Sequence, residues 1–361
     1  MMDDWISLKN ACTLLKVSRP TLNKIRREAR LKEHRIANRV LLSKIDIIKK
    51  VMLQNDHERE RNLVVTSPAE FGDVQPIVGV YDLRKIDRID AYGVMTILCD
   101  IKCHLKEDKY NQVYMLVDDG FGCSYLDSIG FFIEVARANQ SRVFANLEDI
   151  CRVQQSTDTV ILPLHQIGYR GAEKKILDQL YGPLLVQGFS EDYCGYIGWI
   201  IGELCDNAHT HSLGGPCYLI IESQVRESTD TRVLLIAMGD TGIGVPTSLQ
   251  SNPVYSALSE ERLLLMAFLS EVSRMNTEPK RGKGLNDVLG IAKGNGAWLR
   301  VESNGQGLFF DFEGQKDEIA LARPPLQTHG TRFCLVLIDS SFQRISRHEI
   351  NKLIQSFLDR Q

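Results

Sequence analysis

The stretch GELCDNAHTHS, residues 202–212, decides how the second half of the chain is expected to fold. On an α-helix, Glu203, Asn207 and His211 are spaced i, i+4 and i+8, so a carboxylate, an amide and an imidazole share one polar stripe. The opposite face of the same helix is apolar and carries Ile200, Ile201, Leu204 and Ala208. Such a stripe needs charged or hydrated partners. A magnesium ion with phosphates would supply them, because an amide oxygen is a hard ligand and Mg²⁺ keeps several waters.

A glycine-rich loop, GDTGIGV at residues 239–245, comes directly after a predicted strand at Leu234–Ala237. Gly242 and Gly244 permit a close approach of the backbone to a ligand. Asp240 can accept a hydrogen bond from an exocyclic amine. The loop is therefore a candidate for contact with a nucleotide base.

Two further glycine-containing segments follow. RGKGLND at 281–287 opens a predicted helix, whose exposed N–H groups and positive dipole end would suit a phosphate. Gly330 and Thr331 enter a final predicted strand at Phe333–Ile338. A single GxG is more often a turn than a phosphate site, but the four segments together, in this order, favour a nucleotide site.

With these motifs, residues 160–340 resemble the histidine-kinase-like (GHKL) ATPase superfamily, which includes gyrase-type topoisomerases, sensor histidine kinases and anti-sigma-factor kinases. The resemblance implies an α/β-sandwich domain that binds ATP with Mg²⁺. In the family's pattern Asn207 would coordinate magnesium, and Glu203 would be the general base for an attacking water or hydroxyl. Asp240 would hold the adenine amino group, with Thr331 close to it.

The resemblance assigns the other nucleotide contacts to loops. Gly242 and Gly244 would pack under the nucleotide, and residues 246–280 would form a mobile lid. The remaining residues expected to bind the cofactor are His211, Gly282, Lys283, Gly284 and Leu285. Kinases and hydrolases of the superfamily share these residues, so the motif indicates nucleotide binding more firmly than it indicates the reaction.

The N-terminal part of the chain is strongly basic. Residues 5–53 hold thirteen lysines and arginines but only three carboxylates, a net charge of +10 in a chain whose total is −3. Such a net positive charge is typical of a domain that binds a polyanion. Apolar spacing over 8–15, a break, and Ser18 before Pro20 predict a helix-turn-helix. A basic hairpin over 32–42 and a helix over 43–53 complete this unit, and 54–62 is the expected linker.

This unit resembles the winged helix-turn-helix of MerR-type regulators and excisionases, on the residues ISLKNA at 6–11, LKVSRPT at 15–21 and VLLS at 40–43. The resemblance implies duplex DNA as a partner, with the second helix in the major groove. The expected DNA-binding residues are Arg19, Asn23, Arg26, Arg27 and Arg30. The alternative is a basic protein-docking module with a solvated charged face.

Residues 63–150 predict a small α/β unit, with strands at 77–83 and 113–118 and helices at 91–105 and 126–135. The segments VGVYDL at 78–83 and IDRIDAYGV at 86–94 resemble a STAS domain, the fold of anti-sigma-factor antagonists. Where the phosphorylated antagonists carry two serines, this chain has Ala91 and Tyr92. An in-chain phosphate acceptor is therefore not expected, and the unit would serve as a module for a protein partner. A generic small α/β domain is the alternative.

Composition supports a folded chain, with 43% hydrophobic and 25% charged residues. Nine scattered cysteines favour reduced, cytosolic thiols, and a zinc site at Cys205, His209 and His211 is disfavoured because no second ligand pair has metal-like spacing. The most apolar stretch, Tyr193–Cys205, is too short to span a bilayer, so we expect a cytoplasmic protein without membrane contact.

The sequence therefore predicts an α+β multidomain chain: a winged helix-turn-helix at 1–53, a STAS-like α/β domain at 63–150, a GHKL ATP-binding domain at 160–340 and a helix within 341–361. The expected function is an ATP-dependent regulator that binds DNA and slowly hydrolyses Mg-ATP. The alternative is an anti-sigma-type serine kinase acting on a separate STAS partner. A homodimer is left open.

Overall fold

The computed structural model describes residues 5–15, 18–28, 33–36, 39–43, 79–84, 86, 88–107, 111–137, 142–145, 147, 159–169, 171, 173–211, 216–226, 231–273, 283–313, 317–322, 324, 329–340 and 342–360. The expected linker at 54–62 and residues 44–53 of the expected helix over 43–53 lie outside these residues, whereas Ser43 is described and ends a strand.

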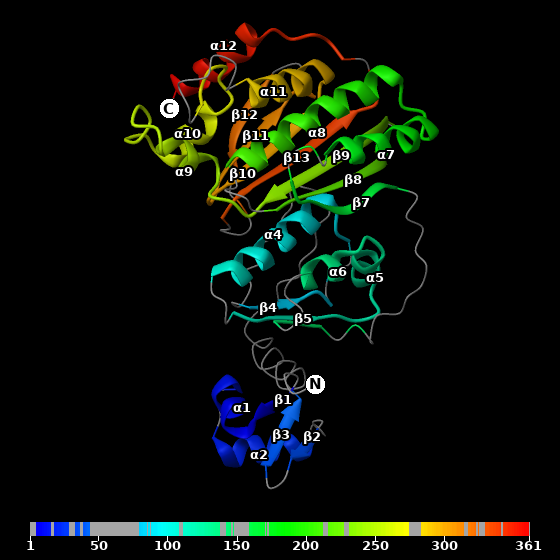
Figure 1. Cartoon of the computed structure of the whole chain (residues 1–361), viewed down its shortest axis with the longest axis vertical. Helices are drawn as coiled ribbons and strands as arrows, with labels where there is room; N and C mark the ends of the chain where they lie inside the picture. The colour runs from blue at the N-terminus through cyan, green and yellow to red at the C-terminus, as the bar shows by residue number, and fades with distance from the viewer. Residues whose placement is uncertain are drawn as a thin grey trace.

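The second half of the chain is organised around a seven-stranded antiparallel sheet (Figure 1). Its strand order is β12-β11-β10-β13-β9-β8-β7. The strands are β7 (Val160–Ile167), β8 (Cys217–Arg226), β9 (Thr231–Asp240), β10 (Trp298–Ser303), β11 (Gln306–Asp311), β12 (Glu318–Ala322) and β13 (Thr331–Ile338). The two strands predicted around residues 234–237 and 333–338 are confirmed as parts of β9 and β13, which are hydrogen-bonded neighbours.

Four helices accompany one face of this sheet: α7 (Glu173–Val186), α8 (Glu191–His211), α11 (Gly284–Asn295) and α12 (Arg347–Leu358). The predicted apolar face of α8 is confirmed, because Ile200, Ile201 and Leu204 are at most 1% exposed. They belong to the same core as Ile236 of β9. Two short helices, α9 (Val245–Gln250) and α10 (Glu260–Met266), follow β9 along the chain. This packing turns the polar stripe of α8 away from the sheet core.

The N-terminal unit, at the bottom of Figure 1, contains two helices and a small antiparallel sheet. Its elements are β1 (Trp5–Ser7), α1 (Leu8–Leu15), α2 (Arg19–Glu28), β2 (Glu33–Ile36) and β3 (Arg39–Ser43). The two predicted helices and the predicted hairpin are present as α1, α2 and the β2-β3 pair. Ala11, Leu22 and Leu42 are fully buried. Helix α2 therefore packs against the rest of this unit through Leu22, and Arg19 on the same helix is exposed.

The middle unit has a three-stranded parallel sheet with the order β4-β5-β6. Its elements are β4 (Val80–Asp82), α4 (Ala91–Glu107), β5 (Val113–Leu116), α5 (Phe121–Ser128), α6 (Phe131–Ala136) and β6 (Val143–Ala145). The prediction of one helix over 126–135 is wrong. Gly130 adopts a left-handed conformation with φ of 81°, which glycine tolerates best, and this residue separates α5 from α6.

Helix α4 lies between the two sheets (Figure 1). Thirteen of its seventeen residues are buried, which requires cover on more than one side. A Cβ on Gly239 of β9 would lie 2.7 Å from Cys99 Sγ and 2.9 Å from Met95 Sδ, so α4 packs directly on the strand backbone. The middle unit and the large sheet therefore share one hydrophobic core, and the large sheet is covered on both faces.

The contact between α4 and the sheet also contains buried polar groups. The Glu222 carboxylate on β8 accepts hydrogen bonds from the backbone N–H of Ala91, at 3.3 Å, and from the Tyr125 hydroxyl. Burial, and then the nearby Asp90 carboxylate, raise the pKa of Glu222 to about 8. Arg300 lies over the Tyr92 ring, 5.2 Å from its centroid, and pairs with Glu302. The first turn of α4 is thus fixed to the sheet by hydrogen bonds and charge.

The buried environment of Glu222 predicts that the stability of the folded chain depends on pH, and that substitution of this residue by glutamine removes the dependence. Because the pKa of Glu222 is raised in the folded chain, its contribution to stability is present at low pH and is lost as the pH rises through about 8. The melting temperature of the unmodified chain should fall as the pH rises from about 4.5 to about 8 and then level off, whereas Glu222→Gln should flatten this part of the profile. Thermal denaturation followed by circular dichroism measures the effect. Glu318→Gln, at an exposed position on β12, is the control, and an identical slope in both variants would contradict the account.

Candidate functional site

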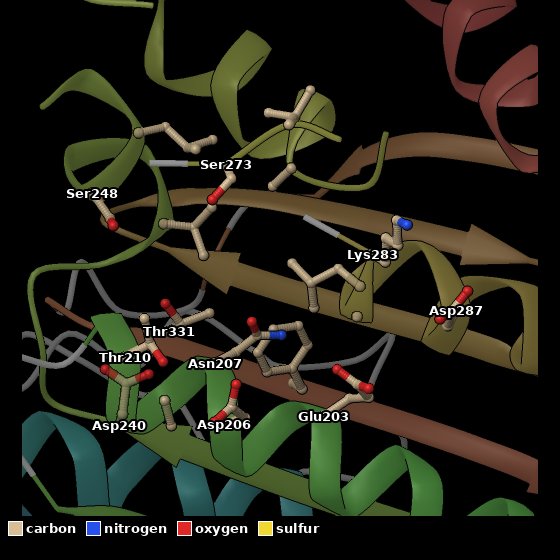
Figure 2. Close-up of a pocket in the computed structure, with 18 of the residues that line it drawn as sticks. Glu203, Asp206, Asn207, Thr210, Asp240, Ser248, Ser273, Lys283, Asp287 and Thr331 are labelled. Atoms are coloured by element: carbon tan, nitrogen blue, oxygen red, sulfur yellow. The ribbon is translucent and has the colours of Figure 1, made fainter. Parts of the chain in front are cut away.

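A cavity of about 380 Å³ lies between α8, the start of α11, helix α9, the end of β9 and the start of β13 (Figure 2). Its volume is within the usual range for small-molecule sites, roughly 300–1,000 Å³. Seven of the residues expected to bind nucleotide line it: Glu203, Asn207, Asp240, Lys283, Gly284, Leu285 and Thr331. These residues come from four separate segments of the chain, which the fold brings to one place.

Asp240 and Thr331 mark one end of the cavity (Figure 2). Asp240 ends β9 and is 7% exposed, and its carboxylate accepts a hydrogen bond of 2.7 Å from the Gly242 N–H. Gly330 has a φ of 88°, and a Cβ there would lie 2.0 Å from the Asp240 carbonyl oxygen. Only glycine therefore allows β13 to begin so close to the end of β9.

Burial raises the pKa of Asp240 to about 6. The N–H groups of Gly242 and Thr331 oppose this shift because they stabilise the carboxylate, and the positive charges of Lys106 and Arg332 act in the same direction. A buried carboxylate at a cavity wall is a selective acceptor for a ligand N–H group, since water competes poorly there.

Glu203, Lys283 and Asp287 lie at the other end of the cavity (Figure 2). Burial raises the pKa of Glu203, the Asp287 and Asp206 carboxylates raise it further, and Arg347 opposes the shift. A raised pKa makes a carboxylate a stronger base, which is the property that a general base needs.

Gly284, the first residue of α11, fits closely against Glu203, because a Cβ at this position would lie 2.3 Å from Glu203 Oε2. The N-terminus of α11 therefore opens onto the cavity beside the carboxylate. The first N–H groups of a helix have no acceptor within the helix, and with the helix dipole they form a site for anions.

Asn207 lies between the two ends (Figure 2). Its Nδ2 is buried and has no hydrogen-bond partner among the described residues. A buried amide without a partner is unfavourable by roughly 1–3 kcal/mol, so this amide is suited to a ligand that satisfies it. The amide can also turn to present Oδ1, the atom that a hard metal ion would bind.

Several expected residues have other positions. Gly242 and Gly244 do not line the cavity. Gly242 holds Asp240 through its N–H, and Gly244, with a φ of 77°, packs on Asn304, where a Cβ would lie 2.4 Å from Oδ1. Gly282 and the side chain of His211 lie outside the described residues.

The cavity is also lined by residues that were not expected to bind the nucleotide, among them Trp199, Asp206, Asp287 and Arg347. The i+3 spacing of Asp206 from Glu203 was visible in the sequence, and it places the two carboxylates on neighbouring parts of α8. No local pattern points to Arg347, which reaches the site from α12 and binds Asp287.

The predicted DNA-binding face is described only in part. Arg19 is exposed on α2, whereas Asn23 and Arg26 are partly buried. Arg26 Nη1 donates a hydrogen bond of 2.9 Å to Asn23 Oδ1. The side chain of Arg27 and all of Arg30 lie outside the described residues.

Across the part of the chain that the structure describes, no three His, Cys, Asp or Glu side chains are grouped so as to hold a metal ion. In the same part of the chain, no helix is long and apolar enough to cross a membrane.

No protein-family model matches this chain, and no curated protein matches it. Among solved structures, the 43K ATPase domain of gyrase B from Thermus thermophilus, in complex with an aminocoumarin, is similar at 17% identity and a TM-score of 0.24. The similarity covers 49% of this chain and 43% of that one, so the chain spans less than half the length of its structural neighbour. The cavity residues, rather than this slight likeness, support the function proposed below.

The raised pKa of Asp240 predicts how the site responds to pH. As the pH falls from 7.5 to 5.5 the carboxylate takes up a proton and ceases to be a good acceptor, so the affinity for a ligand that donates an N–H group to it, with ATP as the probe, should fall. Asp240→Asn should weaken binding about tenfold at pH 7.5, because hydrogen bonds to charged groups contribute about 1.5–3 kcal/mol, and should reduce the pH dependence. Calorimetric titration at several pH values measures both effects.

Asp206→Asn is the matched control for this prediction, because it removes a carboxylate from the same cavity. It should retain the pH dependence of the unmodified chain. The raised pKa also means that the charged form of Asp240 opposes folding above pH 6, so the melting temperature of Asp240→Asn at pH 7.5 should not fall. A pH profile that survives in Asp240→Asn would show that another group titrates.

Proposed function

We propose that this chain binds Mg-ATP in the cavity between α8 and α11 and hydrolyses it slowly, as a nucleotide-dependent regulator of the GHKL type. The observation that carries the proposal is the convergence of four separated sequence motifs on one cavity. A buried acceptor lies at one end of it, a helix N-terminus and a carboxylate at the other, and an amide without a partner between them.

In this proposal Asp240 accepts a hydrogen bond from the exocyclic amine of adenine, and Thr331 lies beside the base. Gly284 and Leu285 offer N–H groups to the phosphates at the start of α11, and Lys283 adds a positive charge. Asn207 would hold magnesium through its amide oxygen. Bound Mg-ATP would supply the phosphoanhydride bond that is broken, and the metal would partly neutralise the negative charge of the phosphate oxygens.

Glu203 is the proposed general base. Its carboxylate lies directly beside the N-terminus of α11, where the phosphates would bind, and its raised pKa allows it to accept a proton from water. The absence of a side chain at Gly284 leaves room for this carboxylate at the start of α11.

Hydrolysis is favoured over phosphorylation within the chain by the position of Tyr92. By the resemblance to STAS-type antagonists this residue would stand where they carry a phosphoserine, and it is fully buried where α4 packs on the large sheet. The Arg300 guanidinium covers its ring. A phosphate transfer to this hydroxyl would require α4 to leave the sheet, so we propose water as the acceptor.

The reaction is tested with two variants of the cavity. Glu203→Gln should lower the rate of phosphate release by about 10²–10⁴ while ADP binding survives, since general-base catalysis contributes about this factor. Asn207→Ala should weaken the magnesium-dependent part of the affinity, measured by calorimetry with and without the metal.

Intact-mass spectrometry of the unmodified chain after incubation with ATP should show no phosphate adduct. A stoichiometric adduct, or transfer of labelled phosphate to a separate STAS protein, would instead identify a kinase. The absence of ATP and ADP binding at millimolar nucleotide would refute the proposed site.

We further propose that the N-terminal unit binds duplex DNA. The proposal is supported by the net charge of +10 over residues 5–53 and by the exposure of Arg19 on α2, the helix that would enter the major groove. The hydrogen bond between Arg26 and Asn23 orders two of the side chains expected at this face in the absence of DNA.

DNA binding by the full chain should depend steeply on salt. Each phosphate contact contributes about −0.9 to the slope of log affinity against log salt concentration, so Arg19→Ala should reduce the slope by about one unit. Lys352→Ala, at an exposed position on α12, is the control and should not change it. Fluorescence anisotropy with a labelled duplex measures the slope, and no binding at low salt would leave the protein-docking alternative.

A further inference from the structure

The C-terminal helix α12 is fixed firmly at its first turn. Ser346 caps the helix, and Ser346 and Glu349 form a reciprocal capping box. Ile350, Ile354 and Leu358 anchor the helix in the main core, where α12 packs against α10 and α11. Arg347, as the first residue of the helix, therefore projects from a rigid support.

The place of Arg347 in the helix is locally unfavourable. A positive charge in the first turn of a helix opposes the helix dipole, which favours acidic residues there. Arg347 is held instead by Asp287 on α11, through hydrogen bonds from Nε and Nη2 to the two carboxylate oxygens, each 2.6 Å long. A residue that breaks a local rule and is retained by a long-range contact is a candidate for function.

Arg347 also lines the cavity, at the end where Glu203 lies. Its charge opposes the rise in the pKa of Glu203, which lines the same cavity. The side chain is 46% exposed, and its two bonds to Asp287 use only part of the five N–H groups of a guanidinium. Further donors therefore remain for a ligand.

Cationic side chains are few in this cavity, so each of them is a candidate to bind a phosphate group of the proposed nucleotide. Among the described residues that line it, four are carboxylates, Glu203, Asp206, Asp240 and Asp287, and only Lys283 and Arg347 are cations. A nucleoside triphosphate carries more negative charge than one Mg²⁺ neutralises, and its terminal phosphate would lie nearest the proposed general base. The planar guanidinium fork matches phosphate oxygens.

We propose that Arg347 binds the terminal phosphate of ATP and thereby makes the site prefer ATP over ADP. This inference rests on the proposed function, since it assigns a residue to the phosphate end of the same cavity. Asp287 acts as a positioning residue that presents the guanidinium. Because Arg347 is the first residue of α12, a terminal phosphate bound to it would be in direct contact with the C-terminal helix.

The test compares the affinities of the full chain for Mg-ADP and for the Mg complex of a non-hydrolysable imido analogue of ATP, by calorimetry. Arg347→Ala should weaken the ATP analogue about tenfold or more and ADP less than twofold. Arg347→Lys should lie between, because it keeps the charge but loses the fork. Arg344→Ala, at an exposed position that does not line the cavity, is the matched control and should change neither affinity.

Asp287→Asn separates ligand binding from a purely structural role. If Arg347 serves only to pair with Asp287, then Asp287→Asn and Arg347→Ala will have the same effect on both nucleotides, and the proposal fails. If Arg347 binds the terminal phosphate and Asp287 only positions it, Asp287→Asn will reduce the preference for the ATP analogue less than Arg347→Ala does. Equal weakening of both nucleotides by Arg347→Ala also overturns the proposal, whereas an unmodified chain that binds neither nucleotide refutes the proposed function itself.

Discussion

Strand β9 is buried on both faces, and the rest of the structure depends on this constraint. Leu234, Ile236 and Met238 face the core formed with α8, whereas Ala237 and Gly239 face α4. Asp240 ends the strand, so the packing that buries the strand also removes water from the carboxylate and raises its pKa. The hydrophobic core and the chemistry of the cavity therefore have one physical origin.

The other end of the cavity is shaped by electrostatic repulsion that the fold tolerates. Glu203, Asp206 and Asp287 lie near one another, and each of the other two raises the pKa of Glu203. The pairing of Asp287 with Arg347 offsets part of this repulsion, and the absence of a side chain at Gly284 leaves room for Glu203. A cationic ligand, or an anion that brings a metal with it, would relieve the repulsion.

The middle unit reaches the cavity loop through the last turn of α4. Lys106 Nζ donates a hydrogen bond of 2.8 Å to the Thr241 carbonyl oxygen, directly after Asp240, and Cys103 Sγ donates to the His329 carbonyl oxygen at 3.4 Å. A lysine in the last turn of a helix is also favoured by the helix dipole. Helices α4 and α12 thus contact opposite ends of the site, and each belongs to a part of the chain outside the motif-bearing helix α8.

The sequence by itself determined the elements whose signals are local. Helical periodicity predicted the buried and polar faces of α8, and glycine spacing predicted the loop at Asp240 and the start of α11, because backbone conformation and side-chain periodicity are set by near neighbours. The break between α5 and α6 at Gly130 was missed, since an isolated glycine inside an apolar run is a weak signal. Only the tertiary structure decided that α4 covers the sheet, that Gly244 packs on Asn304, and that Arg347 binds Asp287 sixty residues away. These contacts depend on the packing of segments that are distant in the chain, and no local pattern of residue types encodes which of those segments meet.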